Sequence, residues 1–319
     1  MITVEEKTNA DPQWNERLLN SKVGTIAQTK EFGSFKQLDS GANPLFLKFI
    51  NSKGKIVGQL LTLLYSRSEK KNSISKIIGK IYPHRTFCKW VYGPIIFDPN
   101  FTNEIISALY DFLKINKFTV WGSNHPLSDV LFTPKDSFKI DNWATFLLDL
   151  RQDRDTILKN MHKKSARKNI ERSIARNVEI KEINKTDLKT YHRLSLETKQ
   201  ESNTSLSLME KQWDMLNPVG YTGFLAYENA NPIGGIKISS FNGYVMEFSI
   251  VRSKQDTTAK LYAQDLLKWK ILEWGIQNKF NYYDFMGVNP YSKNKKEEGI
   301  YRYKQKWGGT LYKYNIIKS

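Results

Sequence analysis

The 319-residue sequence contains one cysteine, Cys88. A single cysteine excludes an intramolecular disulfide and any metal site made of clustered cysteines. Long hydrophobic runs are also absent: the uncharged stretch 215–227 has 13 residues, whereas a helix needs about 18 to 20 apolar residues to cross a bilayer. The first residues form no apolar segment of the kind that begins a secretory signal. We therefore expect a soluble, cytoplasmic protein.

The signature motifs of several enzyme classes are missing as well. The sequence has no G-x-x-x-x-G-K-[ST] phosphate loop, no G-x-G-x-x-G after a strand and no H-E-x-x-H. Their absence argues against a P-loop nucleotide hydrolase, a dinucleotide-binding dehydrogenase and a zinc metalloprotease. The 4 histidines are scattered without the spacing of metal ligands. We expect neither a metal nor a resident cofactor.

Acidic residues are too few to balance the basic ones. Lys and Arg number 49 against 32 Asp and Glu, which gives a formal net charge of +17. Three stretches, residues 66–90, 154–176 and 292–319, each carry a net charge of +6, so the rest of the chain is close to neutral. Clustered positive charge indicates a polyanionic partner: nucleic acid, nucleotide phosphates or an anionic membrane surface. The alternative is a solvated surface that keeps the protein soluble, although such surfaces usually mix both signs.

Hydrophobic residues make up 40% of the chain and aromatic residues 13%, enough for packed cores and too much for a disordered protein. The length suits about two domains of roughly 100 to 200 residues. Helical and strand-like patterns alternate, which predicts an α/β or α+β fold. In the second half we expect strands at 178–183, 221–227, 233–240, 244–251, 282–286 and 310–317, and helices at 186–199, 206–216, 259–278 and 295–306. This β-α-α-β-β-β-α-β-α-β order is that of the acetyltransferase-like (GNAT) fold.

The first half gives a looser copy of the same order. Its helices are expected at 15–20, 30–37 and 103–114, and its strands at 45–50, 55–66, 90–97, 118–121 and 144–150. We therefore predict two tandem GNAT-like domains with mixed central sheets, over residues 1–150 and 151–319. A basic helix at 154–177 connects them, and the C-terminal strand is a candidate for returning to the first domain.

The GNAT pyrophosphate signature, [Q/R]-x-x-G-x-[G/A], is not found where the fold would place it. After the strand that ends at Val251 the sequence reads Arg252-Ser-Lys-Gln-Asp-Thr-Thr-Ala, without a glycine. Glycines in that loop let the N–H groups of a helix N-terminus approach the phosphates of coenzyme A. Their loss argues against an ordinary acetyl-CoA enzyme.

Three stretches carry a family resemblance. They are KKSARKNIERSIARNV at 163–178, LLKWKILEWG at 266–275 followed by YDFMG at 283–287, and GIYRYKQKWGG at 299–309. Weaker similarity to the same family is found at 28–36 and in Gly93-Pro94 with Asp98. Together they resemble the Fem family of aminoacyl-tRNA-dependent peptidyltransferases, which build the interpeptide bridges of peptidoglycan with two tandem GNAT-like domains. The most specific part of the likeness is the combination of Y-D-x-x-G with G-x-Y-x-[FY]-K-x-x-[FW]-G.

The resemblance implies a donor, an amino acid esterified to tRNA, on the side of the second domain. It implies an acceptor on the side of the first domain, an amine of a phosphate-bearing peptidoglycan precursor. No cofactor is implied beyond the aminoacyl-tRNA co-substrate. We expect a monomer with peripheral contact to an anionic membrane. Two positions depart from the family pattern: Asn177 stands where a glycine is usual, and Tyr92 replaces a basic residue before Gly93-Pro94.

Transfer of an activated ester to an amine needs orientation, removal of a proton and stabilisation of the tetrahedral oxyanion. Lys304, in the last of the motifs, is the candidate for a charge beside that oxyanion or beside the terminal tRNA phosphates. By the family match, Tyr303 lies next to the donor, with a ring suited to stack on the terminal adenine. The alternatives are a solvated helix lysine for Lys304 and ordinary core packing for Tyr303.

Two carboxylates are candidates for the general base. Asp284 ends an apolar strand, where it could take a proton or, with Gly287 close by, hold a loop by accepting backbone hydrogen bonds. We favour the loop-holding role for Asp284. Glu247 is a lone acid in the middle of an expected strand, and is either a general base or an outward-facing surface residue.

Substrate contacts are expected from Tyr92 and from four basic residues, Lys36, Lys163, Lys164 and Arg167. Lysine offers a phosphate a point charge, and arginine offers it a bidentate fork; the alternative for each is ordinary surface charge. Two rival functions remain open beside the Fem-type aminoacyltransferase. One is an N-acyltransferase of the same fold that uses acyl-CoA, and the other is a non-catalytic RNA-binding protein built on a GNAT scaffold.

Overall fold

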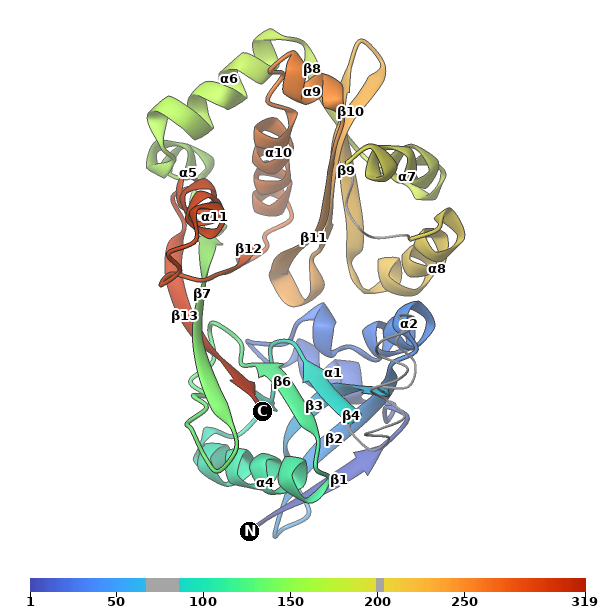
Figure 1. Cartoon of the computed structure of the whole chain (residues 1–319), viewed down its shortest axis with the longest axis vertical. Helices are drawn as coiled ribbons and strands as arrows, with labels where there is room; N and C mark the ends of the chain where they lie inside the picture. Colours follow the sequence, from blue (N-terminus) through green and yellow to red (C-terminus); the bar gives the residue numbers. More distant parts are fainter. Residues whose placement is uncertain (67–85, 199–203) are drawn as a thin grey trace. The chain divides into compact units, whose positions relative to one another are not determined.

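The structure, a computed structural model, describes residues 1–66, 86–198 and 204–319 (Figure 1). It divides into two compact units: unit 1 comprises Met1–Ala144 and Lys313–Ser319, and unit 2 comprises Thr145–Tyr312. The chain enters unit 2 inside strand β7 (Lys139–Asp149) and leaves it inside strand β13 (Thr310–Lys318). The division therefore falls within a continuous strand rather than after residue 150. Of the basic stretch at 66–90, residues 67–85 lie outside the described part.

Unit 1 is built on a mixed sheet. Its elements are β1 (Ile2–Lys7), α1 (Trp14–Leu19), η1 (Ile26–Gln28), α2 (Lys30–Ser40), β2 (Asn43–Asn51), β3 (Ile56–Ser66), β4 (Thr86–Trp90), β5 (Ile95–Ile96), η3 (Pro99–Phe101), α4 (Thr102–Ile115) and β6 (Thr119–Ser123), with sheet order β1-β2-β3-β4-β6-β13. Strand β1, which the sequence patterns did not predict, pairs antiparallel with β2. The strand expected at 90–97 is two strands, because Tyr92 has a φ of 55° that extended backbone cannot accommodate.

The core of unit 1 lies between this sheet and helix α4. Ile105, Leu109 and Leu113 recur at the three- to four-residue spacing of one helix face and are buried in one cluster with Trp90 of β4. Gly122 of β6 permits this packing, because a Cβ there would lie 1.9 Å from the Trp90 ring.

Unit 2 follows the element order predicted for the second half. Its elements are α5 (Arg154–Asn160), η4 (Lys163–Arg167), α6 (Lys168–Ala175), β8 (Val178–Glu182), η5 (Lys185–Asp187), α7 (Leu188–Glu197), α8 (Leu206–Leu216), η6 (Asn217–Val219), β9 (Tyr221–Glu228), β10 (Asn231–Ser239), η7 (Phe241–Gly243), β11 (Tyr244–Arg252), α9 (Lys254–Thr258), α10 (Ala263–Gln277), β12 (Tyr282–Val288) and α11 (Lys295–Gln305), with sheet order β7-β12-β11-β10-β9-β8. Helices α7 and α8 pack on one face of this sheet and α10 on the other (Figure 1). No helix within the described ranges is long and apolar enough to cross a membrane.

The basic helix expected at 154–177 is interrupted. It consists of α5, the π-helical turn η4 and α6, because Met161 after α5 is extended with φ −69° and ψ 149°. Asn177, which replaces the family's glycine, has a φ of 55°. Asparagine is one of the few residues besides glycine that enters the left-handed region readily, so the turn into β8 is retained.

The helix expected at 259–278 begins later, at Ala263. Lys260 and Tyr262 have φ values of 53° and 58°, which end α9 and separate it from α10. Helix α10 is also buried on most of its circumference, including the charged residue Lys268. The expected amphipathic helix is therefore a central one, covered on several sides.

Lys237 on β10 is a buried cation on the face that carries α7 and α8. The residue is 4% exposed, and its Nζ lies 4.7 Å from the centre of the Tyr191 ring and donates over 3.4 Å to Gln212 Oε1. Burial disfavours the ammonium form and lowers the pKa of Lys237 from 10.5 to about 8.

We expect Lys237→Met to raise the free energy of unfolding at pH 7 by about 1 to 3 kcal/mol, because each pKa unit represents about 1.4 kcal/mol. The unfolded chain keeps the lysine proton up to about pH 10.5, whereas the native lysine loses it near pH 8. The wild type should therefore gain stability relative to the variant as the pH rises through this window.

Urea unfolding of both proteins from about pH 7 to 10 measures this gap. Lys189→Met, at an exposed position of α7, controls for the loss of a surface lysine. A gap between wild type and Lys237→Met that stays constant with pH would contradict the burial argument.

Candidate active site

Strands β11 and β12 of unit 2 separate at Glu247. They pair in parallel over residues 244–246 and 282–284, and within the described chain their ladder extends no further, so the strands run apart (Figure 1). The register of β11 against β10 also shifts next to Glu247, at a β-bulge. Bulges re-aim side chains and are frequent beside active sites. We call this place, marked by Glu247 on β11 and Phe285 on β12, the β11–β12 fork.

Glu247 is held at the fork by two donors. Lys268 of α10 forms an ion pair with Glu247 Oε1, and the side chains of Lys268 and Glu247 are 1% and 9% exposed. Tyr283 Oη donates to the same oxygen over 2.7 Å. Both donors use Oε1, and Oε2 makes no hydrogen bond with the described residues. Glu247 is therefore a fixed, buried carboxylate with one oxygen available, and the outward-facing surface role is wrong.

Lys304 on α11 reaches back to strand β12. Its Nζ donates to the carbonyl oxygens of Met286 over 2.9 Å and of Gly287 over 3.0 Å. An ammonium has three N–H donors, so one remains for a ligand, and two neutral carbonyls do not cancel its charge. Burial lowers the pKa of Lys304, although the carboxylates of Glu247 and Asp284 act in the opposite direction. Lys304 is thus an anchored, half-buried cation and not a solvated helix lysine.

Asp284 is fully buried and fully engaged. It accepts hydrogen bonds from the Thr145 hydroxyl, from Tyr244 Oη over 2.9 Å and from the N–H of Met286 over 2.7 Å. Met286 has a φ of 64°, and its N–H and C=O are fixed by Asp284 and Lys304 respectively. These contacts suit the loop-holding role for Asp284. The Y-D-x-x-G motif and the lysine of the second motif therefore build one turn together.

Tyr303 lies between two lysines. Its ring centre is 4.3 Å from Lys306 Nζ and 5.7 Å from Lys268 Nζ. Burial raises the pKa of the Tyr303 phenol well above its ordinary value, and the carboxylates of Asp265 and Glu247 add to this effect. The phenol is therefore neutral at physiological pH and able to donate a hydrogen bond. Because the lysines cover the ring, its hydroxyl is better placed than its face to contact a ligand.

The motif glycines let the end of α11 pack closely. Gly308 has a φ of 79°, and a Cβ there would lie 2.7 Å from the carbonyl oxygen of Asn160. A Cβ on Gly309 would lie 2.9 Å from the carbonyl oxygen of Leu147. Trp307, fully buried, stacks on Phe285 at the fork. The G-x-Y-x-Y-K-x-x-W-G motif thus fixes Tyr303 and Lys304 beside β12.

Three predicted phosphate contacts, Lys163, Lys164 and Arg167, share the π-helical turn η4. This turn adjoins α11, because the N–H of His162 donates over 2.8 Å to the carbonyl of Lys306. Lys163 and Lys164 are exposed, and Arg167 is half-buried. Unit 2 therefore brings these basic residues next to the helix that carries Tyr303 and Lys304.

The other two predicted residues, Lys36 and Tyr92, belong to unit 1. Lys36 on α2 pairs with Asp39 over 2.8 Å. Tyr92 is 2% exposed, and its ring packs edge-on against those of His125 and Tyr314, with centroids 5.0 and 5.9 Å away. Tyr92 is therefore part of the packed interior of unit 1, and its ring is not presented to a ligand there.

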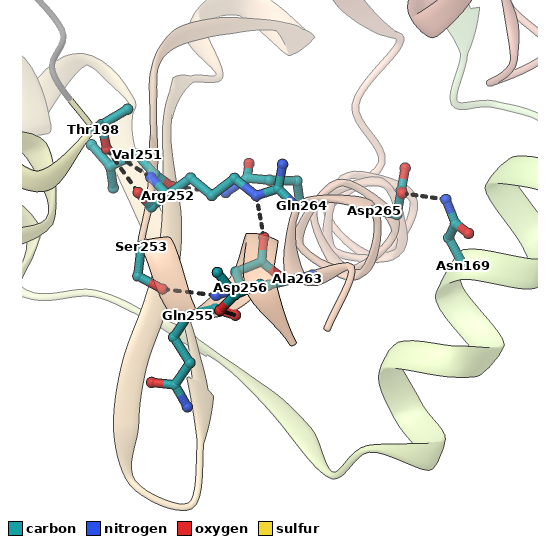
Figure 2. A network of polar contacts seen from close by, with 11 residues as sticks. Asn169, Thr198, Val251, Arg252, Ser253, Gln255, Asp256, Ala263, Gln264 and Asp265 are labelled. Atoms are coloured by element: carbon teal, nitrogen blue, oxygen red, sulfur yellow. Dashed lines mark hydrogen bonds and ion pairs between the residues drawn. The ribbon is translucent and has the colours of Figure 1, made fainter. Parts of the chain in front are cut away.

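The N-terminus of α10 is closed by a side chain of the protein itself (Figure 2). Segment 252–259 contains the short helix α9, whose capping residue Ser253 accepts from the N–H of Asp256 over 3.1 Å. The buried Asp256 accepts the N–H of Ala263, the first residue of α10, over 2.9 Å and pairs with Arg252. The helix terminus that binds pyrophosphate in acetyl-CoA enzymes is thus occupied by a carboxylate.

Sequence reasoning missed Lys268, Lys306 and Asp256. For Lys268 the signal was ambiguous: the largely apolar stretch 266–272 also contains Lys270, which is exposed, so the sequence did not show which lysine would be buried and need a partner. Lys306 pairs with Asp265, and Asp256 with Arg252. These two pairs gave no signal, because each lies in a polar stretch that resembles solvated surface.

No protein-family model matches the chain. No curated protein matches it either. Solved structures do: FemX is 12% identical over 98% of this chain and 96% of that chain, with a TM-score of 0.68. L-PGS from Bacillus licheniformis is 12% identical over 97% and 91%, with a TM-score of 0.56. A tandem GNAT protein from the clavulanic acid biosynthesis pathway is 11% identical over 99% and 97%, with a TM-score of 0.54. The predicted architecture is therefore confirmed: the chain has a mixed α/β, tandem GNAT-like fold similar to that of FemX.

Proposed function

We propose that the protein is an aminoacyltransferase that moves an amino acid from aminoacyl-tRNA to an amine of a phosphate-bearing precursor, with the reaction at the β11–β12 fork. The likeness to FemX and L-PGS supports a transferase of this kind. The observation that carries the proposal is the closed N-terminus of α10, where Asp256 accepts the N–H of Ala263. A pyrophosphate needs those N–H groups free, and it would there meet a buried carboxylate. The donor is therefore one that does not depend on a pyrophosphate at α10.

The chemistry needs a charge beside the oxyanion, a base for the amine proton and an acid for the leaving oxygen. The acceptor amine attacks the ester carbonyl carbon, and the carbonyl oxygen becomes an oxyanion. Lys304, with its remaining N–H and uncancelled charge, stabilises that oxyanion. Glu247 Oε2 removes the proton that the attacking nitrogen loses when the C–N bond forms. Lys268 and Tyr283 both contact Oε1 of Glu247 and thereby orient Oε2 for this step.

Collapse of the tetrahedral intermediate breaks the bond between the carbonyl carbon and the ribose oxygen of the tRNA. The leaving oxygen needs a proton, and the neutral Tyr303 phenol is a donor close to Lys304 on the same helix. The phenol recovers its proton from protonated Glu247 through solvent, so the amine proton ends on the ribose hydroxyl. The amide and deacylated tRNA are the products.

We expect acetyl-CoA to bind weakly, with a dissociation constant above about 1 mM, which corresponds to a binding free energy smaller than about 4 kcal/mol. Isothermal titration calorimetry with acetyl-CoA and a longer acyl-CoA checks this. Micromolar binding of either would contradict the closed-terminus argument and would place the acyl-CoA N-acyltransferase first.

The function itself is tested by transfer from tRNA charged with labelled amino acids. Amine-dependent movement of label from tRNA to a small primary amine supports the proposal. Tight tRNA binding without amine-dependent loss of label, across all charged tRNAs and several amines, would instead favour the non-catalytic RNA-binding protein.

A further inference from the structure

The segment from η4 to the end of α6 carries a dense set of cations. Residues 163–176 contain six basic residues and one acid, Glu171. None of the six forms an ion pair with a carboxylate in the described parts of the chain, whereas cations elsewhere in unit 2, such as Lys268 and Lys306, do. Charge left unpaired by the protein is available to an anionic partner.

Four of these cations recur every four residues: Lys164, Lys168, Arg172 and Arg176, here called the α6 cationic stripe. All four are exposed. Residues four apart are neighbours on a helix surface and are separated by roughly 6 Å along the axis. That repeat is close to the spacing of successive phosphates in one nucleic-acid strand. Of these four residues, only Lys164 was among the phosphate contacts expected from the sequence.

Both arginines of the stripe are held in position by the turn before α10. The guanidinium carbons of Arg172 and Arg176 lie 5.4 and 5.6 Å from the centre of the Tyr262 ring. Arg172 also donates to Tyr262 Oη over 3.4 Å, and Arg176 donates to the carbonyl of Lys260 over 2.6 Å. These neutral contacts orient each guanidinium without neutralising it. A guanidinium group that is held in position suits phosphate oxygens, because it can bind two of them at once.

The same surface is poorly suited to insertion into a membrane. A helix that lies in a lipid interface needs a free apolar face. The inward face of α6 is already used, because its buried residues, Ile170 and Ser173, lie on the side that packs on α10. Ile174, 54% exposed, is a single apolar side chain on the outer surface. A polyphosphate that stays in water, rather than a bilayer, fits this arrangement.

Side-chain contacts connect α6, which carries the stripe, to the end of α11 beside the fork. Asp265 accepts from Asn169 of α6 over 2.9 Å and also pairs with Lys306, next to the helix of Lys304. We infer that the α6 cationic stripe binds consecutive phosphates of one strand of an RNA and directs that strand to the β11–β12 fork. This inference rests on the proposed function for its choice of RNA, and assigns to Arg172 and Arg176 a part in tRNA binding.

The test compares Arg172→Gln/Arg176→Gln with a control that removes two other exposed cations of unit 2, Lys189→Gln/Lys211→Gln. Binding of purified bulk tRNA is measured between about 50 and 200 mM salt. Each lost phosphate contact should reduce the slope of log affinity against log salt by about 0.7 to 0.9, so the stripe variant, which lacks two arginines, should lose about 1.4 to 1.8. Its dissociation constant should rise roughly tenfold or more, and the control should match the wild type.

Two further measurements separate the outcomes. Wild-type transfer from charged tRNA is followed in parallel, and binding to phosphatidylglycerol vesicles is measured for all three proteins. Equal salt slopes in the three proteins overturn the inference that the stripe binds RNA. The proposed function survives that result if the wild type still transfers the amino acid from tRNA. Vesicle binding lost in the stripe variant with unchanged tRNA binding also overturns the inference. A stripe-dependent slope without any transfer supports the stripe and counts against the proposed function.

Discussion

Replacing Lys304 with methionine is expected to slow single-turnover aminoacyl transfer by about a hundredfold or more, the scale seen when one oxyanion donor is removed. The physical reason is that the oxyanion carries its full charge only in the transition state, so the lysine stabilises that state more than the bound ester. Binding of the acceptor amine should change little. Methionine keeps the apolar stem of the side chain and removes the charge.

The structure adds a second consequence to this substitution. Lys304→Met leaves the carbonyls of Met286 and Gly287 without their donor, which should cost about 1 to 3 kcal/mol of stability where these groups stay dry. Stability must therefore be measured beside the rate. Arg302→Met, at an exposed position of the same helix, is the matched control, and Lys304→Arg should retain part of the rate because it keeps the charge. Full turnover in the methionine variant would remove Lys304 from the mechanism.

The order of helices and strands was predictable because local patterns decide it. Strands β9, β10 and β11 alternate with clear turn residues, and α8 spans the predicted residues 206–216. The predictions failed where one residue overrides a periodic pattern. Tyr92 divides one expected strand, and Met161 interrupts one expected helix. Such breaks depend on packing between distant parts of the chain, which composition and periodicity do not register.

The candidate site was predictable only in part for the same reason. Glu247, Asp284 and Lys304 were identified singly, from motifs or from an acid within a strand. Their partners were not, because the contact between Glu247 and Lys268 joins β11 to α10 across the core. The pairing changes the interpretation of Glu247, because a buried lysine from another element holds its carboxylate.

That pairing makes Glu247→Gln the second variant with a large expected effect. Glutamine keeps the shape and can still accept from Tyr283, yet it cannot take a proton from the amine. Loss of a general base typically lowers the rate by about 10² to 10⁴, and single-turnover transfer measures this. The same change leaves the Lys268 ammonium buried without a counter-charge. Removing one partner of a buried ion pair typically costs about 3 to 5 kcal/mol of stability. A low rate alone therefore does not distinguish a catalytic role from loss of the fold.

The double variant Glu247→Gln/Lys268→Met separates the two effects. It removes both charges, and replacing a buried ion pair with apolar or neutral groups of similar size is often neutral or stabilising. We therefore expect its free energy of unfolding to return to within about 1 to 2 kcal/mol of the wild type, while the transfer rate stays as low as in Glu247→Gln. Lys268→Met alone should keep the carboxylate and so retain more activity than either variant that lacks it. If the double variant regains the rate together with the stability, Glu247 only supports the fork, and the amine must lose its proton to another group or to water.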